Sequence, residues 1–432
     1  MENPTTQSRL LGEPHDVRRA LQLLGELLTD SAATTESPES FIWRALGAPP
    51  TSLACESINT TAWAGVSLSA ALNDLILKFE PTLGPAVSDQ APTWTQVRID
   101  DETLSLPAAT AAHFPAGTVA EIPVVIQIER NEYGDYDWDL RIFADPTRRA
   151  DAREVLDELS RTAIEEKNFY RGRVVAVDLG LTLQWKIIDR PALRRDDLII
   201  KPDVWSELDL NISALTDRAE VMRERGFSTR RGVLLAGPPG VGKSAIARVI
   251  AGELVGDFTV IIVDARAGAS ALRAVYRETE RFGPTLVVLE DVDLYLGDRR
   301  RGDGGSALAD FLAVMDGAEE YEEVLTIAST NDPAALDAAA VRSARFDSII
   351  TLGYPDQADR ARILRRYLAG LDVDLDIEAI AAMLPDNVSG ADLREIVRRA
   401  LLAHGTDLTT ERIRQVIKEG RWQPEPLQGS YL

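Results

Sequence analysis

The feature that most constrains this chain is a glycine-rich stretch that reads Gly-Pro-Pro-Gly-Val-Gly-Lys-Ser from Gly237 to Ser244. An apolar run at residues 233–236 precedes it, and a helical pattern at residues 245–254 follows it. This order of strand, loop and helix matches the P-loop template G-x-x-x-x-G-K-S/T in sequence and in context. Glycines let backbone N–H groups turn around an anion, and the following helix presents its free N–H groups to phosphate. The stretch therefore predicts a nucleotide-binding site.

Two side chains of this stretch have predicted roles of their own. Lys243 is expected to reach the outer phosphates, and Ser244 is expected to offer its hydroxyl to Mg²⁺. The alternative is a glycine-rich turn without a ligand, which average composition would produce in roughly one or two of a hundred chains of this length. The predicted nucleotide contacts of the loop are Gly237, Pro238, Pro239, Gly240, Val241, Gly242, Lys243 and Ser244.

The composition is that of a soluble globular protein. The chain has 432 residues, which suggests two or three domains, and 45% of them are hydrophobic. Its formal net charge of -22 argues against nucleic acid or an anionic membrane surface as the main partner.

The cysteine and histidine residues indicate the redox state of the cellular compartment and whether a zinc site is expected. A lone cysteine, Cys55, excludes an intrachain disulfide and favours a reducing compartment. The histidines are too far apart in the sequence to suggest a zinc site. They are His15, His113 and His404. The first residues lack a signal-peptide core, and Asn73 and Asp74 interrupt the apolar window at residues 62–77. We therefore expect a cytoplasmic protein without a membrane span.

The first 115 residues predict a mostly helical and irregular region that binds a partner. Apolar residues recur at helical spacing in residues 14–30 and again in residues 68–76. Stretches rich in Ser, Thr, Pro and Ala, such as residues 34–40 and 81–92, predict loops. The tryptophans are interpreted as core or partner-contact residues; they are Trp43, Trp63 and Trp94.

Residues 116–200 predict an α+β segment. Apolar residues alternate along the two arms of a predicted β-hairpin at residues 121–145. The further predicted elements are a helix at residues 147–167, short strands at residues 172–178 and 181–188, and a charged linker at residues 191–197.

From residue 204 onward the pattern becomes α/β. Apolar strands alternate with helices, which implies a parallel sheet whose two faces are covered. These strands are predicted at residues 233–236, 259–263, 286–289 and 324–329. The chain then turns wholly helical, with helices predicted at residues 358–368, 377–383, 390–403 and 410–419. Ser389 and Thr409 are placed to cap the last two, and residues 421–432 predict a tail.

Polar side chains follow two of these strands where each strand ends. Glu290 and Asp291 end the third strand, which lies beside the P-loop strand in a P-loop fold, so one carboxylate can hold Mg²⁺ and the other can polarise a water. Asn331 ends the fourth strand and is placed to orient that water. Arg342 and Arg345 can place positive charge on a departing γ-phosphate. The alternatives are a helix cap or a surface pair for the two carboxylates, an ordinary strand-end residue for Asn331, and salt bridges for the two arginines.

Taken together, residues 206–420 resemble the AAA family of ATPases. The motifs that carry the resemblance, besides the glycine-rich loop, are Leu289-Glu290-Asp291-Val292-Asp293, Phe311 to Gly317, Ser329-Thr330-Asn331, Ala335-Leu336-Asp337, Arg345-Phe346-Asp347, Tyr354-Pro355-Asp356 and Ser389 to Leu393. The resemblance implies an αβα P-loop NTPase domain at residues 204–354 and a helical lid at residues 355–420. It also implies ATP and Mg²⁺ as cofactors, and a homo-oligomeric ring, usually a hexamer, with ATP at each subunit boundary.

The resemblance assigns roles to individual residues. Asn331 looks like the sensor of the family, and Arg342 and Arg345 look like arginine fingers donated to the ATP of the neighbouring subunit. Gly390 and Ala391 would pass close to the adenine and the ribose.

The order of the two acids departs from the family, whose usual pair is Asp followed by Glu. Glu290 would then take the metal role and Asp291 the role of the base, with a carboxylate retracted by about 1.5 Å, the length of one C–C bond. The mitochondrial respiratory-complex assembly AAA translocase carries a similar Leu-Glu-Asp-Val-Asp, and the motif details are most similar to that protein. Hydrolysis is therefore still expected.

The segment expected to face a central pore also departs from the family. Many AAA unfoldases place an aromatic residue there, but residues 264–270 contain none, which argues against threading of a peptide by an aromatic grip. Residues 299–305 are basic and rich in glycine, as a second pore loop or a solvated surface loop would be.

Three functions remain open at this point. The first is a ring-forming AAA ATPase that couples ATP hydrolysis to the remodelling, assembly or translocation of a protein partner, bound through the first 200 residues. The second is an ATP-gated scaffold or switch with slow hydrolysis, which the order of the acids and the pore segment favour. The third is a nucleic-acid-associated motor, which the net charge argues against.

Overall fold

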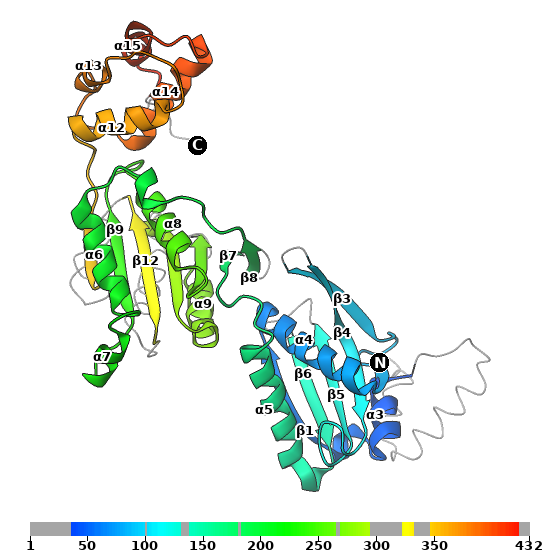
Figure 1. The fold of residues 1–432 in the computed structure, drawn as a ribbon. Helices are drawn as coiled ribbons and strands as arrows, with labels where there is room; N and C mark the ends of the chain where they lie inside the picture. The colour runs from blue at the N-terminus through cyan, green and yellow to red at the C-terminus, as the bar shows by residue number, and fades with distance from the viewer. Residues whose placement is uncertain are drawn as a thin grey trace, which may run out of the picture. The chain divides into compact units, whose positions relative to one another are not determined.

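The computed structural model describes residues 36–99, 102–130, 138–179, 183–264, 268–293, 322–331 and 346–422. The chain divides into two units, residues 1–167 and residues 168–432 (Figure 1). The helix predicted at residues 14–30 lies outside the described residues.

The first unit is built around an antiparallel sheet. Its strands are β1 (Ala54–Thr60), β2 (Thr82–Pro85), β3 (Thr93–Ile99), β4 (Glu102–Phe114), β5 (Val124–Arg130) and β6 (Trp138–Ala144). Among the described residues, the strand order is β1-β6-β5-β4-β2, and β3 pairs with β4. The hairpin predicted at residues 121–145 is confirmed, because β5 and β6 pair with Ile126 opposite Ile142.

Helices cover both faces of this sheet. They are α3 (Pro38–Leu46), α4 (Ala62–Phe79) and α5 (Arg149–Glu165), with 3-10 turns η1 (Pro50–Ser52) and η2 (Pro146–Arg148). Helices α4 and α5 lie side by side (Figure 1). Gly65 of α4 meets Trp138 of β6, whereas Phe41 of α3 belongs to a cluster with Phe143 of the same strand. Because successive strand residues point to opposite faces, α3 and α4 pack on opposite faces of the sheet.

Residues 54–114 hold four strands of this sheet, where the sequence predicted mostly helical and irregular structure. The strand β4 contains few of the β-branched and aromatic residues that mark a strand. Its consecutive residues Ala111 and Ala112 are both fully buried, so no alternation of polar and apolar side chains signals the strand. Small side chains bring α4 close to it, and Ser69 Oγ of α4 donates to the carbonyl of Pro107 at 2.6 Å. Tertiary packing decides the conformation here.

We expect Gly65→Ala to destabilise the first unit. A Cβ at this position would lie 2.1 Å from Cγ of Trp138, whose side chain is buried and has no room to move. Overpacking of this kind costs about 1–3 kcal/mol, although alanine otherwise favours a helix over glycine. Chemical unfolding followed by tryptophan fluorescence measures the loss. Gly353→Ala is the control, because nothing lies within 4 Å of its added Cβ. Equal stability of the two variants would contradict the close packing.

The second unit is built around a largely parallel sheet. Its strands are β7 (Val174–Leu179), β8 (Leu183–Ile188), β9 (Arg231–Ala236), β10 (Thr259–Asp264), β11 (Thr285–Glu290), β12 (Val324–Thr330) and β13 (Ser348–Thr351). Among the described residues, the strand order is β13-β9-β12-β11-β10-β7-β8, and β8 runs antiparallel to β7. The parallel sheet predicted from the alternation of strands and helices is confirmed, with β13 added at one edge.

The position of β7 and β8 differs from the predicted division of the chain. The sequence groups both strands with the preceding hairpin, in residues 116–200. In the structure β7 pairs in parallel with β10, with Val174 opposite Val260, so both strands extend the second sheet. The first unit ends at residue 167. Its last helix, α5, still buries Val155 and Leu159, as the helical spacing predicts.

Helices pack on both faces of the second sheet. They are α6 (Pro202–Ser213), α7 (Ala219–Glu224), α8 (Lys243–Leu254) and α9 (Gly268–Phe282), and a 3-10 turn, η3 (Arg195–Asp197), precedes α6. Ile246 and Ile250 of α8 share a buried cluster with Ile327 of β12. The hydroxyl of Tyr276 in α9 lies 2.5 Å from Oγ1 of Thr326, which points to the other face of β12. The sheet is therefore sandwiched between two helical layers.

A small bundle of helices completes the second unit. It comprises α12 (Gln357–Leu368), α13 (Ile377–Ala382), α14 (Gly390–His404) and α15 (Thr410–Glu419), close to the predicted bounds. The bundle has its own buried cluster, in which Ile380, Leu393 and Ile413 are fully buried. Ser389 and Thr409 cap α14 and α15, as predicted. Within the described part of the chain, we find no helix with the length and apolarity that a membrane span requires.

Candidate active site

The glycine-rich loop connects β9 to α8, and its three glycines, Gly237, Gly240 and Gly242, all have positive φ. Gly237 has a φ of 156°, and a Cβ there would lie 2.1 Å from the carbonyl oxygen of Leu352. Gly240 has a φ of 79°, in the left-handed region that side chains disfavour. The loop therefore needs these glycines for close backbone approach as well as for its turn.

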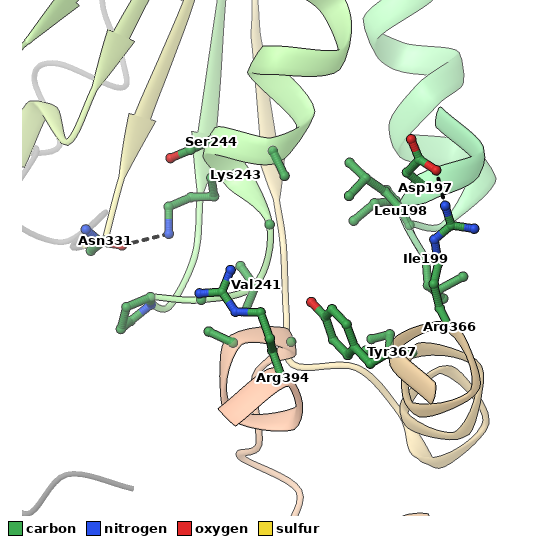
Figure 2. Close-up of a pocket in the computed structure, with 18 of the residues that line it drawn as sticks. Asp197, Leu198, Ile199, Val241, Lys243, Ser244, Asn331, Arg366, Tyr367 and Arg394 are labelled. Atoms are coloured by element: carbon green, nitrogen blue, oxygen red, sulfur yellow. Dashed lines mark hydrogen bonds and ion pairs between the residues drawn. The ribbon is translucent and has the colours of Figure 1, made fainter. Parts of the chain in front are cut away.

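Lys243 lies at the centre of the site. Its side chain is 5% exposed, and Nζ donates to the carbonyls of Gly237 and Pro238 and to Oδ1 of Asn331, each at 2.8 Å (Figure 2). Burial lowers the pKa of Lys243, while the nearby carboxylates of Asp291 and Asp293 raise it. The described residues thus satisfy three donors of a buried ammonium group, as a buried charge requires.

Asn331 joins Lys243 to the acidic residues at the end of β11. Its Nδ2 donates to Oδ1 of Asp291 at 2.9 Å, while its Oδ1 accepts from Lys243. Its backbone N–H donates to Oδ1 of Asp293, also at 2.9 Å. The carboxyl ends of the neighbouring strands β11 and β12 therefore bring together the lysine, the amide and one carboxylate, which the sequence predicted as site residues.

Glu290 is the last residue of β11, and its side chain is near α8. Its Oε1 is 4.0 Å from Nη2 of Arg248. Ser244 precedes Arg248 by four residues, so both lie on one face of α8. A hydroxyl and a carboxylate on this face suit Mg²⁺, which binds proteins through one or two oxygen ligands together with substrate phosphates. The donor set therefore fits the predicted roles of Ser244 and Glu290.

A pocket of about 480 Å³ opens beside the loop (Figure 2). The predicted site residues that line it are Pro239 to Ser244, Asp291, Asn331, Gly390 and Ala391. Gly237 and Pro238, which were also predicted, are not among the lining residues. The backbone N–H of Ala391 donates to the carbonyl of Gly240 at 3.1 Å, so α14 begins directly against the loop. The bundle thereby forms one wall of the pocket.

Several lining residues were not predicted. Residues 197–200 form a further wall, and Arg366, Tyr367 and Arg394 project from α12 and α14 (Figure 2). Arg366 is ion-paired with Asp197. The apolar run at residues 198–200, directly after a charged segment, is the one sequence signal that these positions carry.

Other predicted residues lie outside the described part of the chain. These are Arg342 and Arg345, the whole of the second pore segment at residues 299–305, and residues 265–267 of the first pore segment.

Comparison with known proteins identifies the domain that holds this pocket. Residues 233–354 match the model of the ATPase family associated with various cellular activities (AAA). The chain contains an AAA ATPase domain. Such a domain implies ATP as the ligand and ATP hydrolysis as the reaction, and the glycine-rich loop that lines the pocket lies within the matched residues.

The relatives of the AAA domain include several FtsH proteins. The chain is 35% identical over 246 residues to the ATP-dependent zinc metalloprotease FtsH of Acidothermus cellulolyticus, which spans 52% of this chain and 36% of the relative. It is 38% identical over 193 residues to the ATP-dependent zinc metalloprotease FtsH 4 of Sphaerobacter thermophilus. This match covers 41% of this chain and 29% of the relative. It is 37% identical over 214 residues to the probable inactive ATP-dependent zinc metalloprotease FTSHI 2, chloroplastic, of Arabidopsis thaliana. This match covers 45% of this chain and 24% of the relative.

The similarity to these relatives is confined to part of each protein. The chain spans between 24% and 36% of the length of the three. None of the histidines of this chain belongs to an H-E-x-x-H sequence, which supplies zinc ligands in metalloproteases. Within the described ranges, no group of three or more His, Cys, Asp or Glu side chains is placed to hold a metal ion.

We expect Gly240→Ala to weaken nucleotide binding by about tenfold or more. An added Cβ would lie 2.6 Å from Oγ of Ser389 and 2.8 Å from Cβ of Ala391, so the loop and α14 would separate at the pocket wall. Titration with a fluorescent ATP analogue measures the change in Kd, and tenfold corresponds to about 1.4 kcal/mol.

Gly256→Ala is the matched control for this substitution. Gly256 also has a positive φ, of 110°, but nothing lies within 4 Å of its added Cβ. Both variants therefore carry backbone strain, and only Gly240→Ala also displaces α14. Equal losses of affinity would show that the contact with α14 does not shape the pocket.

Proposed function

We propose that this chain is a ring-forming AAA ATPase that couples ATP hydrolysis to the remodelling, assembly or translocation of a protein partner. The observation that carries the proposal is the hydrogen-bonded series Lys243–Asn331–Asp291 beside the pocket. It places a cation for the outer phosphates next to an amide and a carboxylate that can handle a water molecule.

The chemistry assigns one task to each group of this series. Lys243 exchanges its carbonyl partners for phosphate oxygens when ATP enters the pocket. Asn331 orients the attacking water, and Asp291 accepts a proton from that water as it attacks the γ-phosphate. Charge moves onto the leaving phosphate oxygens, where cations stabilise it.

Magnesium is the expected second ligand of the site. Ser244 and Glu290 would hold it, together with phosphate oxygens, and it would neutralise charge on the β- and γ-phosphates. Glu290 then has a role distinct from that of Asp291, which lines the pocket itself.

The ring is proposed because the resemblance to the AAA family gives Arg342 and Arg345, which lie outside the described residues, the role of arginine fingers. Arg342 and Arg345 would reach the ATP of a neighbouring copy and stabilise charge on its γ-phosphate. A hexamer is the usual closed arrangement of such subunits, with the same heterologous contact repeated around a rotation axis.

The protein partner is proposed to bind through the first unit, in the cytoplasm. The net charge of -22 favours a protein over a nucleic acid as the partner. The lone Cys55 suits a reducing compartment.

A second candidate function is an ATP-gated scaffold that hydrolyses slowly. The shorter acid at position 291 favours it, as does the lack of an aromatic residue in the pore segment. A turnover above about one per second, the lower end of ordinary enzymes, would exclude this candidate.

We expect two substitutions to separate binding from turnover. Lys243→Ala should abolish ATP binding, because it removes the cation that the phosphates contact. Asp291→Asn should keep ATP bound and lower kcat by at least about 100-fold, because the amide cannot accept the proton. Fluorescent nucleotide titration and phosphate release measure the two effects. Lys418→Ala, on the exposed face of α15, is the control and should change neither. Full turnover by Asp291→Asn would contradict its role as the base.

A mixture of two inactive variants tests the ring. Lys243→Ala subunits lack a nucleotide site but keep their arginines, and Arg345→Ala subunits keep the site but lack an arginine finger. If the finger acts on the neighbouring subunit, mixing them should restore part of the ATPase activity that each lacks alone. Phosphate release, measured against the ratio of the two variants, should peak at an intermediate ratio. A flat response would exclude a shared site.

A further inference from the structure

The backbone at Asp291 departs from the strand that precedes it. Asp291 has a φ of 52°, in the left-handed region that costs free energy for any residue with a Cβ. The other described non-glycine residues with positive φ are Glu80, Asp89 and Glu323. Asp291 differs from them because it lines the nucleotide pocket. Strain of this kind persists only where the surrounding structure holds it.

The left-handed turn explains how two successive acids face the same helix. Residues of a regular strand point alternately to opposite faces, so Glu290 and Asp291 should diverge. Yet Glu290 lies 4.0 Å from Arg248 of α8, and Asp291 is joined through Asn331 to Lys243 of the same helix. The left-handed turn at Asp291 breaks this alternation, and the Asp291 carboxylate accepts from Asn331, which itself accepts from Lys243.

The neighbouring strand β12 holds this turn from two directions. The backbone N–H of Asp291 donates to Oγ of Ser329 at 3.2 Å, and the carboxylate accepts from Nδ2 of Asn331 at 2.9 Å. Ser329 is 2% exposed, so its hydroxyl is sheltered from competing water. A partly buried backbone N–H without an acceptor is costly, and the Ser329 hydroxyl is its acceptor in this conformation.

We propose that Ser329 is a positioning residue that stabilises the left-handed turn and so places the Asp291 carboxylate at the nucleotide. The inference rests on the proposed ATPase function. An Asp at this position needs such help because its carboxylate ends one methylene short of that of a Glu. The Ser329 hydroxyl thus compensates for the order of the two acids, acting through the backbone of Asp291 and without touching the substrate.

The test compares two buried hydroxyls on β12. Ser329→Ala removes the acceptor of the Asp291 N–H, and Thr326→Val removes a hydroxyl that is fully buried and lies 2.5 Å from Tyr276 on the other face. Both variants should lower the unfolding midpoint to a similar extent. Only Ser329→Ala should also lower kcat, by roughly tenfold or more, with KM within about twofold, because a misplaced base slows chemistry more than binding.

A double variant tests whether the effect passes through the carboxylate. In an Asp291→Asn background, Ser329→Ala should lower kcat by less than about twofold further, because the base that it positions is already gone. Equal kcat for Ser329→Ala and Thr326→Val, or an undiminished effect in the Asp291→Asn background, would overturn the inference while the wild-type ATPase stands. A wild-type chain without turnover at saturating ATP would instead overturn the proposed function, and the inference with it.

Discussion

The buried ammonium group of Lys243 is the constraint on which the rest of the site depends. A charge that is 5% exposed needs oxygen partners, and the carbonyls of Gly237 and Pro238 and the amide of Asn331 supply them. The first two partners set the path of the glycine-rich loop, and the third ties the loop to the end of β12. In the proposed function, ATP would replace oxygens that already surround this cation. Preformed polar surroundings of this kind reduce the reorganisation that catalysis requires.

The sequence predicted those site residues that directly follow the strands of the parallel sheet. In a parallel sheet the carboxyl ends of neighbouring strands share one edge, so a lysine after β9 and polar residues after β11 and β12 must converge. Arg366 and Arg394 could not be predicted in this way, because a separate helical bundle brings them to the pocket. Nor could the contact of Ser329 with the Asp291 backbone, because a positive φ at a non-glycine residue leaves no mark in the sequence.

The fold was predictable where periodicity was strong and not where packing overrode it. Apolar runs placed the strands of the second sheet, and helical spacing placed the bundle. The strand β4 was not predicted because it is buried on both faces, as the fully buried neighbours Ala111 and Ala112 show. Its sequence therefore lacks the alternation of polar and apolar residues that indicates a strand. The pair β7 and β8 was assigned to the preceding segment because sequence distance suggested it. Only pairing, with Val174 opposite Val260, shows that they belong to the second sheet.

The helical bundle contacts the rest of the second unit at two walls of the pocket. On one wall, the N–H of Ala391 donates to the carbonyl of Gly240 in the phosphate loop. On the other, Arg366 is ion-paired with Asp197, in the segment between β8 and α6. The loop, the segment and the bundle all line the pocket, so a ligand bound there would contact all three. Because the bundle has its own buried core, separate from that of the sheet, these two contacts join two separately packed parts of the second unit.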